Sequence, residues 1–150
     1  MDEEIVVRIS REPGCGDLPA PAHMTDRASG LDLPAAIAEA TTLEPGEFRM
    51  VPTGFCVEIP PGYEGQVRPR SGLAAKYGLG VVNSPGTIDA DYRGTVHVIL
   101  INWGPEPVTI HRGDRIAQLV VQRVPRVRVV EVDELGETGR QDGGFGHTGR

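Results

Sequence analysis

Glycine and proline divide this chain into short segments. Its 150 residues include 20 Gly and 13 Pro, and the apolar runs between them are rich in Val and Ile. Such runs favour short strands joined by tight turns over a helical bundle. The length suits one domain with a single core. The composition therefore predicts an all-β fold.

Several segments can be assigned to elements. We expect strands in the apolar runs 5–10, 62–70 and 95–103, and two or three more in 108–132, where Pro125 interrupts the valines. The segment 46–60 predicts two strands separated near 52–54. The segment 33–40 has helix propensity for about two turns. Ser71 can cap a second short helix, which Gly78 can end.

Charge and cysteine content exclude several classes of protein. The net charge of -6 disfavours a nucleic-acid polymer as partner, because binding to its phosphates needs a positive face. The acidic first ten residues lack a long apolar core, which argues against a signal peptide or membrane partner and for a cytoplasmic protein. Two cysteines and four scattered histidines predict free thiols and no structural zinc site.

The segment 80–94, GVVNSPGTIDADYRG, combines a turn with reactive side chains. The turn formers at 83–86 lie between two apolar pairs, which predicts a β-hairpin. The return strand then carries Asp89, Tyr92 and Arg93, and strand alternation places Asp89 and Arg93 on one face. Folding alone does not require this mixture, so the segment predicts a pocket wall.

Two further sites combine charge or polarity with a turn. Arg70, Ser71 and Gly72 begin the second expected helix, where free N–H groups favour an anion, although taken alone they are better explained by an ordinary serine cap with a surface arginine. Gln118 is the lone polar residue among apolar neighbours. A buried glutamine must be hydrogen-bonded, either to the backbone or to a ligand oxygen.

The last residues form a glycine-rich tail. We divide the chain into a barrel domain, 1–135, and an arm, 136–150, whose one large apolar residue is Phe145. Such tails are commonly flexible linkers. However, an aromatic ring between glycines can fold over a flat partner, with Arg140 and Thr148 beside it as phosphate donors.

Taken in order, five segments resemble the five motifs of the trimeric deoxyuridine triphosphatases (dUTPases). They are ASGLDLPA at 28–35, PRSGLA at 69–74, GVVNSPGTIDADYRG at 80–94, RGDRIAQL at 112–119 and GRQDGGFGHTG at 139–149. The resemblance implies a distorted antiparallel β-barrel of jelly-roll type with one short helix. It also implies a homotrimer whose active sites lie between subunits.

The same resemblance implies a role for each motif in hydrolysing dUTP to dUMP and pyrophosphate. Asp89 would activate the water that attacks the α-phosphorus, and Asp32 would contact Mg²⁺ through water. Tyr92 would pack under the deoxyribose, and Phe145 of another subunit would stack on uracil. The other substrate contacts would be Asn83, Gly86, Thr87 and Ile88 near the nucleoside, and Arg70, Ser71, Gly72, Gln118, Arg140, Gly146 and Thr148 near the phosphates.

Three positions depart from the family pattern: Leu31, Gln141 and His147. Two other functions share this scaffold. A deoxycytidine triphosphate deaminase needs an acidic group beside the base, but the segment 96–102 offers only apolar residues, an asparagine and a histidine. A catalytically silent regulatory trimer would not need Asp89, which the chain retains.

Overall fold

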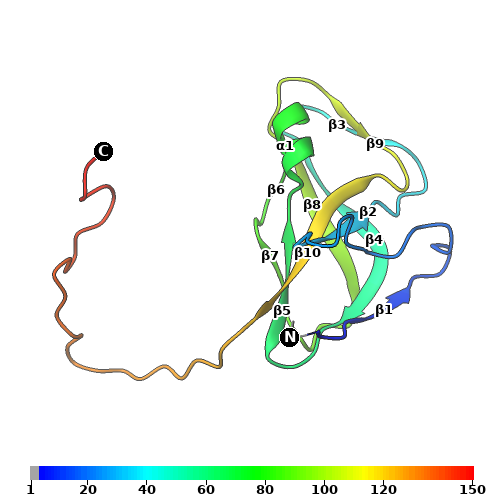
Figure 1. Ribbon diagram of the computed structural model, residues 1–150. Coiled ribbons are helices and arrows are strands. Elements are labelled where there is room, and N and C mark those ends of the chain that lie inside the picture. The colour runs from blue at the N-terminus through cyan, green and yellow to red at the C-terminus, as the bar shows by residue number, and fades with distance from the viewer. Residues whose placement is uncertain (1–3) are drawn as a thin grey trace.

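The structure, a computed structural model, describes residues 4–150 and consists mainly of strands (Figure 1). Its one helix is α1, Ser71–Tyr77. The strands are β1 Arg8–Arg11, β2 Leu31–Pro34, β3 Thr41–Leu43, β4 Phe48–Glu58, β5 Tyr63–Arg68, β6 Leu79–Val81, β7 Gly86–Ile88, β8 Thr95–Asn102, β9 Val108–Ile110 and β10 Arg115–Arg123.

The strands form three antiparallel sheets. The first has the order β1-β4-β8-β6, the second β2-β10-β5-β7, and β3 pairs with β9 in the third. All three contribute to one core, which includes Val98 from the first sheet, Leu119 from the second and Leu43 from the third. The all-β prediction is confirmed, although the three sheets do not close into one continuous ladder.

Two expected elements differ because tertiary pairing overrides local propensity. Residues 33–40 form no helix: Leu33 and Pro34 belong to β2, which pairs with β10 and is buried there. The segment 46–60 contains one long strand, β4, instead of two. Its register against β8 shifts between Pro52 and Cys56, so a β-bulge absorbs the proline and glycine that we expected to separate two strands.

The helix ends as expected but begins differently. Gly78 adopts the left-handed conformation, with φ of 69°, and its N–H donates to the carbonyl of Ala74 at 2.9 Å. The prediction that Ser71 caps the helix was wrong. Arg70 occupies the cap position without a side-chain cap bond, and Ser71 is the first helical residue.

The segment 80–94 is not a β-hairpin. β6 pairs with β8 in the first sheet, whereas β7 pairs with β5 in the second. The turn at 83–85 therefore carries the chain from one sheet to the other. Local turn signals do not distinguish these cases, because strand partners are chosen by contacts distant in sequence.

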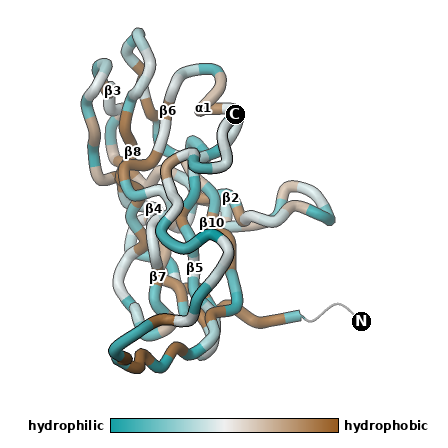
Figure 2. The backbone as a smooth tube through the Cα atoms, turned by 90° about the vertical axis from the view of Figure 1, so that its left-hand side faces the viewer, coloured by the Kyte–Doolittle hydropathy of each residue, from teal (hydrophilic) through white to brown (hydrophobic). Residues whose placement is uncertain are grey.

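The last strand ends at Arg123, and residues 124–150 extend away from the barrel without helix or strand (Figure 1). The strand expected beyond Pro125 is therefore absent from the part of the chain that the structure describes. Figure 2 shows a hydrophobic stretch in this extension, where Val127 and Val129 are 77% and 88% exposed. Across residues 4–150, no helix has the length and apolar character needed to cross a membrane.

Candidate active site

A polar cavity of about 460 Å³ lies where α1 meets β2 and β10. Its lining includes five residues that the sequence singled out, Asp32, Arg70, Ser71, Gly72 and Gln118, together with Arg115. They come from three separate motifs. The fold therefore assembles residues distant in sequence on one surface.

Two arginines share one carboxylate in this cavity. Oδ2 of Asp32 lies 3.1 Å from Nη1 of Arg115 and 3.5 Å from Nε of Arg70. Arg70 also donates to the carbonyl of Arg115 at 3.0 Å, which joins the residue before α1 to the start of β10. Two positive charges face one negative charge, so this group keeps an excess positive charge that suits phosphate.

Gln118 reaches the same cavity through an irregularity in β10. The pairing of β10 with β2 shifts between Arg115 and Ala117. An extra residue in a strand reverses the alternation beyond it, so Arg115 and Gln118 can face one cavity although they are three positions apart. Nε2 of Gln118 donates to the carbonyl of Pro69 at 3.0 Å.

A second cavity of about 240 Å³ lies beside the segment 80–94. The residues expected there, Asn83, Thr87, Ile88, Asp89 and Tyr92, line it with Met50, Thr95, Val96, His97 and Ile99. Gly86 is buried next to Asn83, where a Cβ atom would lie 3.2 Å from the amide nitrogen. The turn thus presents an amide, a carboxylate and an aromatic ring to one space.

Arg93 does not line this second cavity. β7 ends at Ile88, so strand alternation does not extend to Asp89 and Arg93, and that expectation was wrong. Nη1 of Arg93 donates to the carbonyls of Ala90 and Tyr92 at 2.7 and 3.0 Å. Arg93 therefore stabilises its own turn.

The two cavities share no lining residue and lie far apart on one chain. Ile88 pairs with Gly65, which places Asp89 level with Glu64, whereas Ser71 follows seven residues later along β5 and its extended continuation. At about 3.3 Å per residue, seven residues span about 23 Å, so Asp89 and Ser71 are roughly 20 Å or more apart. One triphosphate cannot contact both residues of the same chain.

The expected residues of the arm lie outside both cavities. Arg140 donates to the carbonyl of Gly143 within the arm. Phe145 is fully exposed with a positive φ of 47°, and neither Gly146 nor Thr148 lines either cavity. The structure therefore brings none of the four arm residues to the barrel of its own chain (Figure 1).

Residues 17–149 match the family model of dUTPase. This chain belongs to the dUTPase family. A deoxyuridine 5'-triphosphate nucleotidohydrolase of Caldanaerobacter subterraneus subsp. tengcongensis is 53% identical over 145 residues, which cover 97% of this chain and 98% of the relative. The corresponding protein of Methylocella silvestris is 57% identical over 151 residues, which cover 99% and 94%.

Solved dUTPase structures have the same fold. A mutant dUTPase of Staphylococcus bacteriophage 80alpha, solved with dUpNHpp, superposes with a TM-score of 0.86 at 24% identity, covering 97% of this chain and 99% of that one. A mutant dUTPase from phage phi11 of S. aureus, described with a structural Mg(II) ion, gives 0.76 at 24% identity, covering 87% and 98%.

The donor set of this dUTPase suits a magnesium ion that arrives with phosphate. Among residues 4–150, no group of three His, Cys, Asp or Glu side chains is placed to hold a metal. Asp32 is the one carboxylate lining the first cavity, and two arginines already contact it. Because Mg²⁺ retains waters and often takes few protein ligands beside substrate phosphates, this set fits an indirect contact.

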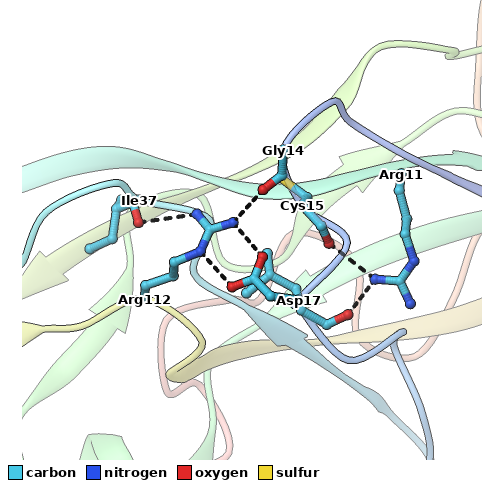
Figure 3. A network of polar contacts seen from close by, with 7 residues as sticks. Arg11, Gly14, Cys15, Asp17, Ile37 and Arg112 are labelled. Atoms are coloured by element: carbon cyan, nitrogen blue, oxygen red, sulfur yellow. Dashed lines mark hydrogen bonds and ion pairs between the residues drawn. The ribbon is translucent and has the colours of Figure 1, made fainter.

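Two arginines of the fourth motif, Arg115 and Arg112, make contacts that the sequence did not predict. Arg115 follows the turn of the fourth motif. It lies beside Arg70 because of the bulge in β10, which strand alternation does not predict. Arg112, in the same turn, holds both carboxylate oxygens of Asp17 at 2.8 Å and the carbonyl of Gly14 at 2.8 Å (Figure 3). This clamp fastens the N-terminal loop to the turn that precedes β10.

Proposed function

We propose that this chain hydrolyses dUTP to dUMP and pyrophosphate, with Asp89 as the general base. Membership of the dUTPase family supports the activity. The roles of the residues are assigned from the way they divide between two cavities. Asn83, Asp89 and Tyr92 line one cavity. Arg70, Ser71 and Gln118 line the other.

Asp89 suits the chemical step because its carboxylate is exposed beside the cavity. It accepts a proton from water as the water oxygen bonds to the α-phosphorus. The bond from that phosphorus to the bridging oxygen breaks, and pyrophosphate leaves. A positioned base typically contributes about 10²- to 10⁴-fold, so charge stabilisation must supply most of the acceleration.

The first cavity supplies that stabilisation. Arg70 and Arg115 provide positive charge, and Ser71, Gly72 and Gln118 provide hydrogen-bond donors to phosphate oxygens. Asp32 would hold Mg²⁺ through water, and the ion when bound neutralises phosphate charge. Arg140, Gly146 and Thr148 of the arm would complete the enclosure of the phosphates.

The second cavity selects the nucleoside. Asn83 reads the edge of uracil beside the backbone amides of Gly86, Thr87 and Ile88. Tyr92 lies under the sugar and excludes a ribose 2′-hydroxyl. Steric exclusion is needed, because one added hydroxyl or methyl group otherwise weakens binding only slightly.

The separation of the two cavities supports a homotrimer with shared sites. Because Asp89 and Ser71 of one chain are about 20 Å apart, the phosphate contacts must come from a second copy. The outer face of β4 and the end of β8 offer an apolar contact surface, in which Phe48, Met50 and Trp103 are exposed. The extended arm would bring Phe145 to the uracil of another copy.

A nucleotide panel tests this proposal. We expect pyrophosphate release from dUTP with Mg²⁺, strong inhibition by a chelator, and little turnover of dCTP, dTTP or UTP. We also expect Asp89→Asn to retain dUTP binding but to lose at least about 10²-fold in kcat. Normal turnover by Asp89→Asn would contradict the role of this residue, and release of ammonia from dCTP would indicate a deaminase.

A further inference from the structure

Tyr92 is folded back over its own turn. Its hydroxyl donates to the carbonyl of Thr95 at 2.9 Å. The ring covers Gly94, where a Cβ atom would lie 2.5 Å from the hydroxyl oxygen and 2.7 Å from Cζ, so only glycine permits this position. The side chain remains 44% exposed and lines the cavity of Asp89. The place of the ring therefore depends on Thr95.

Thr95 begins β8 next to an irregular part of the sheet. The β4–β8 register shifts between Pro52 and Cys56. Thr95 pairs with Cys56 on one side of this bulge, and His97 pairs with Pro52 on the other. The carbonyl of Thr95 also accepts a hydrogen bond from Nδ1 of His97 at 2.9 Å, which requires the proton on that nitrogen. Because a bulge disrupts the ladder locally, the side-chain contacts of Thr95 contribute more to holding this residue in place.

The side chain of Thr95 is held by Glu12, which follows β1 in the N-terminal loop. Oε1 of Glu12 accepts hydrogen bonds from Oγ1 of Thr95 at 2.8 Å and from Sγ of Cys56 at 3.0 Å. The backbone N–H of Glu12 donates to the carbonyl of Gly54 at 2.8 Å, within the bulge itself. Glu12 therefore joins the loop, the bulge and the start of β8.

The protonation states favour this contact at neutral pH. Hydrogen bonds from Cys56 and Thr95 lower the pKa of Glu12. Glu12 and burial raise the pKa of the Cys56 thiol. An ionised carboxylate thus accepts from a neutral thiol and a hydroxyl, and such charge-assisted bonds are stronger than neutral ones.

We propose that Glu12 is a positioning residue for sugar selection, which acts through Thr95 on Tyr92. This inference rests on the proposed role of Tyr92 against the deoxyribose. Glu12 lies outside all five motif segments. Because discrimination against one hydroxyl depends on a steric clash, a small displacement of the ring is enough to relax it.

The test compares kcat/KM for dUTP with kcat/KM for UTP. We expect Glu12→Ala and Thr95→Val each to lower this ratio about 10-fold, mainly through gained activity on UTP, because the clash weakens while Asp89 is untouched. Glu12→Gln keeps an accepting oxygen, so its dUTP-to-UTP ratio should be closer to that of the unmodified protein. The double variant should be no worse than either single variant, since both act on one contact.

Asp17→Ala is the matched control. This substitution loosens the same loop, because it removes the partner of Arg112. The side-chain hydrogen bonds of Asp17 are with Arg112 and not with Thr95. Its dUTP-to-UTP ratio should stay unchanged. A reduced ratio in Asp17→Ala would make the effect a general result of loop loosening and overturn the proposal.

Tyr92→Ala separates failure of this inference from failure of the proposed function. If Tyr92→Ala lowers the ratio while Glu12→Ala and Thr95→Val do not, Glu12 has no positioning role and the sugar contact stands. If Tyr92→Ala leaves the ratio unchanged while dUTP is still hydrolysed, the sugar-contact role itself is wrong, and the Glu12 proposal falls with it.

Discussion

At the scale of single residues, arginine–carboxylate contacts join parts of the chain that are distant in sequence. Asp32 in the first motif contacts Arg70 and Arg115 from the second and fourth motifs. Asp17 in the N-terminal loop contacts Arg112 with two hydrogen bonds. Bidentate pairs fix orientation as well as distance, so they locate the turn before β10.

The Asp17–Arg112 pair predicts a pH dependence of stability. The hydrogen bonds from Arg112 lower the pKa of Asp17 from 3.8 to about 2. A lowered pKa contributes stability above pH 3.8, and that contribution disappears as the pH falls toward 2. Thermal unfolding should therefore show Asp17→Asn with a lower Tm than the unmodified protein at pH 6. The two Tm values should converge near pH 2, and a constant difference across this range would contradict the account.

Gly30 allows Gln118 to occupy its place. A Cβ atom at Gly30 would overlap Oε1 of Gln118 and lie 3.0 Å from its Cβ, so alanine there must displace the glutamine side chain. We expect Gly30→Ala to lower kcat/KM for dUTP by about 10-fold, because misplaced donors lose phosphate contacts. Gly16→Ala is the control, since no other part of the chain lies within 4 Å of the methyl group that it adds. Equal activity of the two variants would exclude this role for Gly30.

At the scale of elements, two bulges decide where functional side chains lie. The shift in β10 turns Arg115 toward the cavity of Gln118, and the shift in β4 leaves Thr95 dependent on Glu12. Bulges are common beside active sites because they redirect side chains without ending a strand. Irregular pairing is therefore part of the site in this barrel.

The sequence predicted those features that depend on local chemistry. Gly78 ends the helix because glycine adopts positive φ without strain, and the apolar run 95–103 forms strand β8. It did not predict which strands pair. The segment 80–94 had every local sign of a hairpin, yet its two strands belong to different sheets. Arg115 was passed over for the same reason, because a register shift cannot be read from alternation.

The arm forms hydrogen bonds within itself, so we expect its role in catalysis to be separable from folding and assembly. The hydrogen bonds of Arg140, Gln141 and Gly143 are made within the arm. Deletion of residues 139–150 should lower kcat by at least about 10²-fold, because phosphate donors and the stacking ring are lost. The Tm and the oligomeric state should not change. Dissociation into monomers, measured by light scattering, would instead indicate a structural role.

At the scale of the whole molecule, one chain carries two half-sites that cannot serve the same substrate molecule. The cavity of Asp89 and the cavity of Ser71 share no residue and lie about 20 Å apart. Rings of identical subunits place different surfaces of neighbouring copies together. Oligomer formation is thus a requirement of catalysis in this account.

The most direct test combines two variants, Asp89→Asn and Arg70→Ala. We expect each to be nearly inactive alone, whereas a trimer that contains both can pair an intact Asp89 of one copy with an intact Arg70 of the next. Random co-assembly in equal amounts should restore about a quarter of the unmodified dUTPase activity, since each site draws on two neighbouring copies in a cyclic assembly. Variants mixed without subunit exchange provide the baseline. If co-assembled trimers stay at that baseline, each site lies within one chain, and the central claim is wrong.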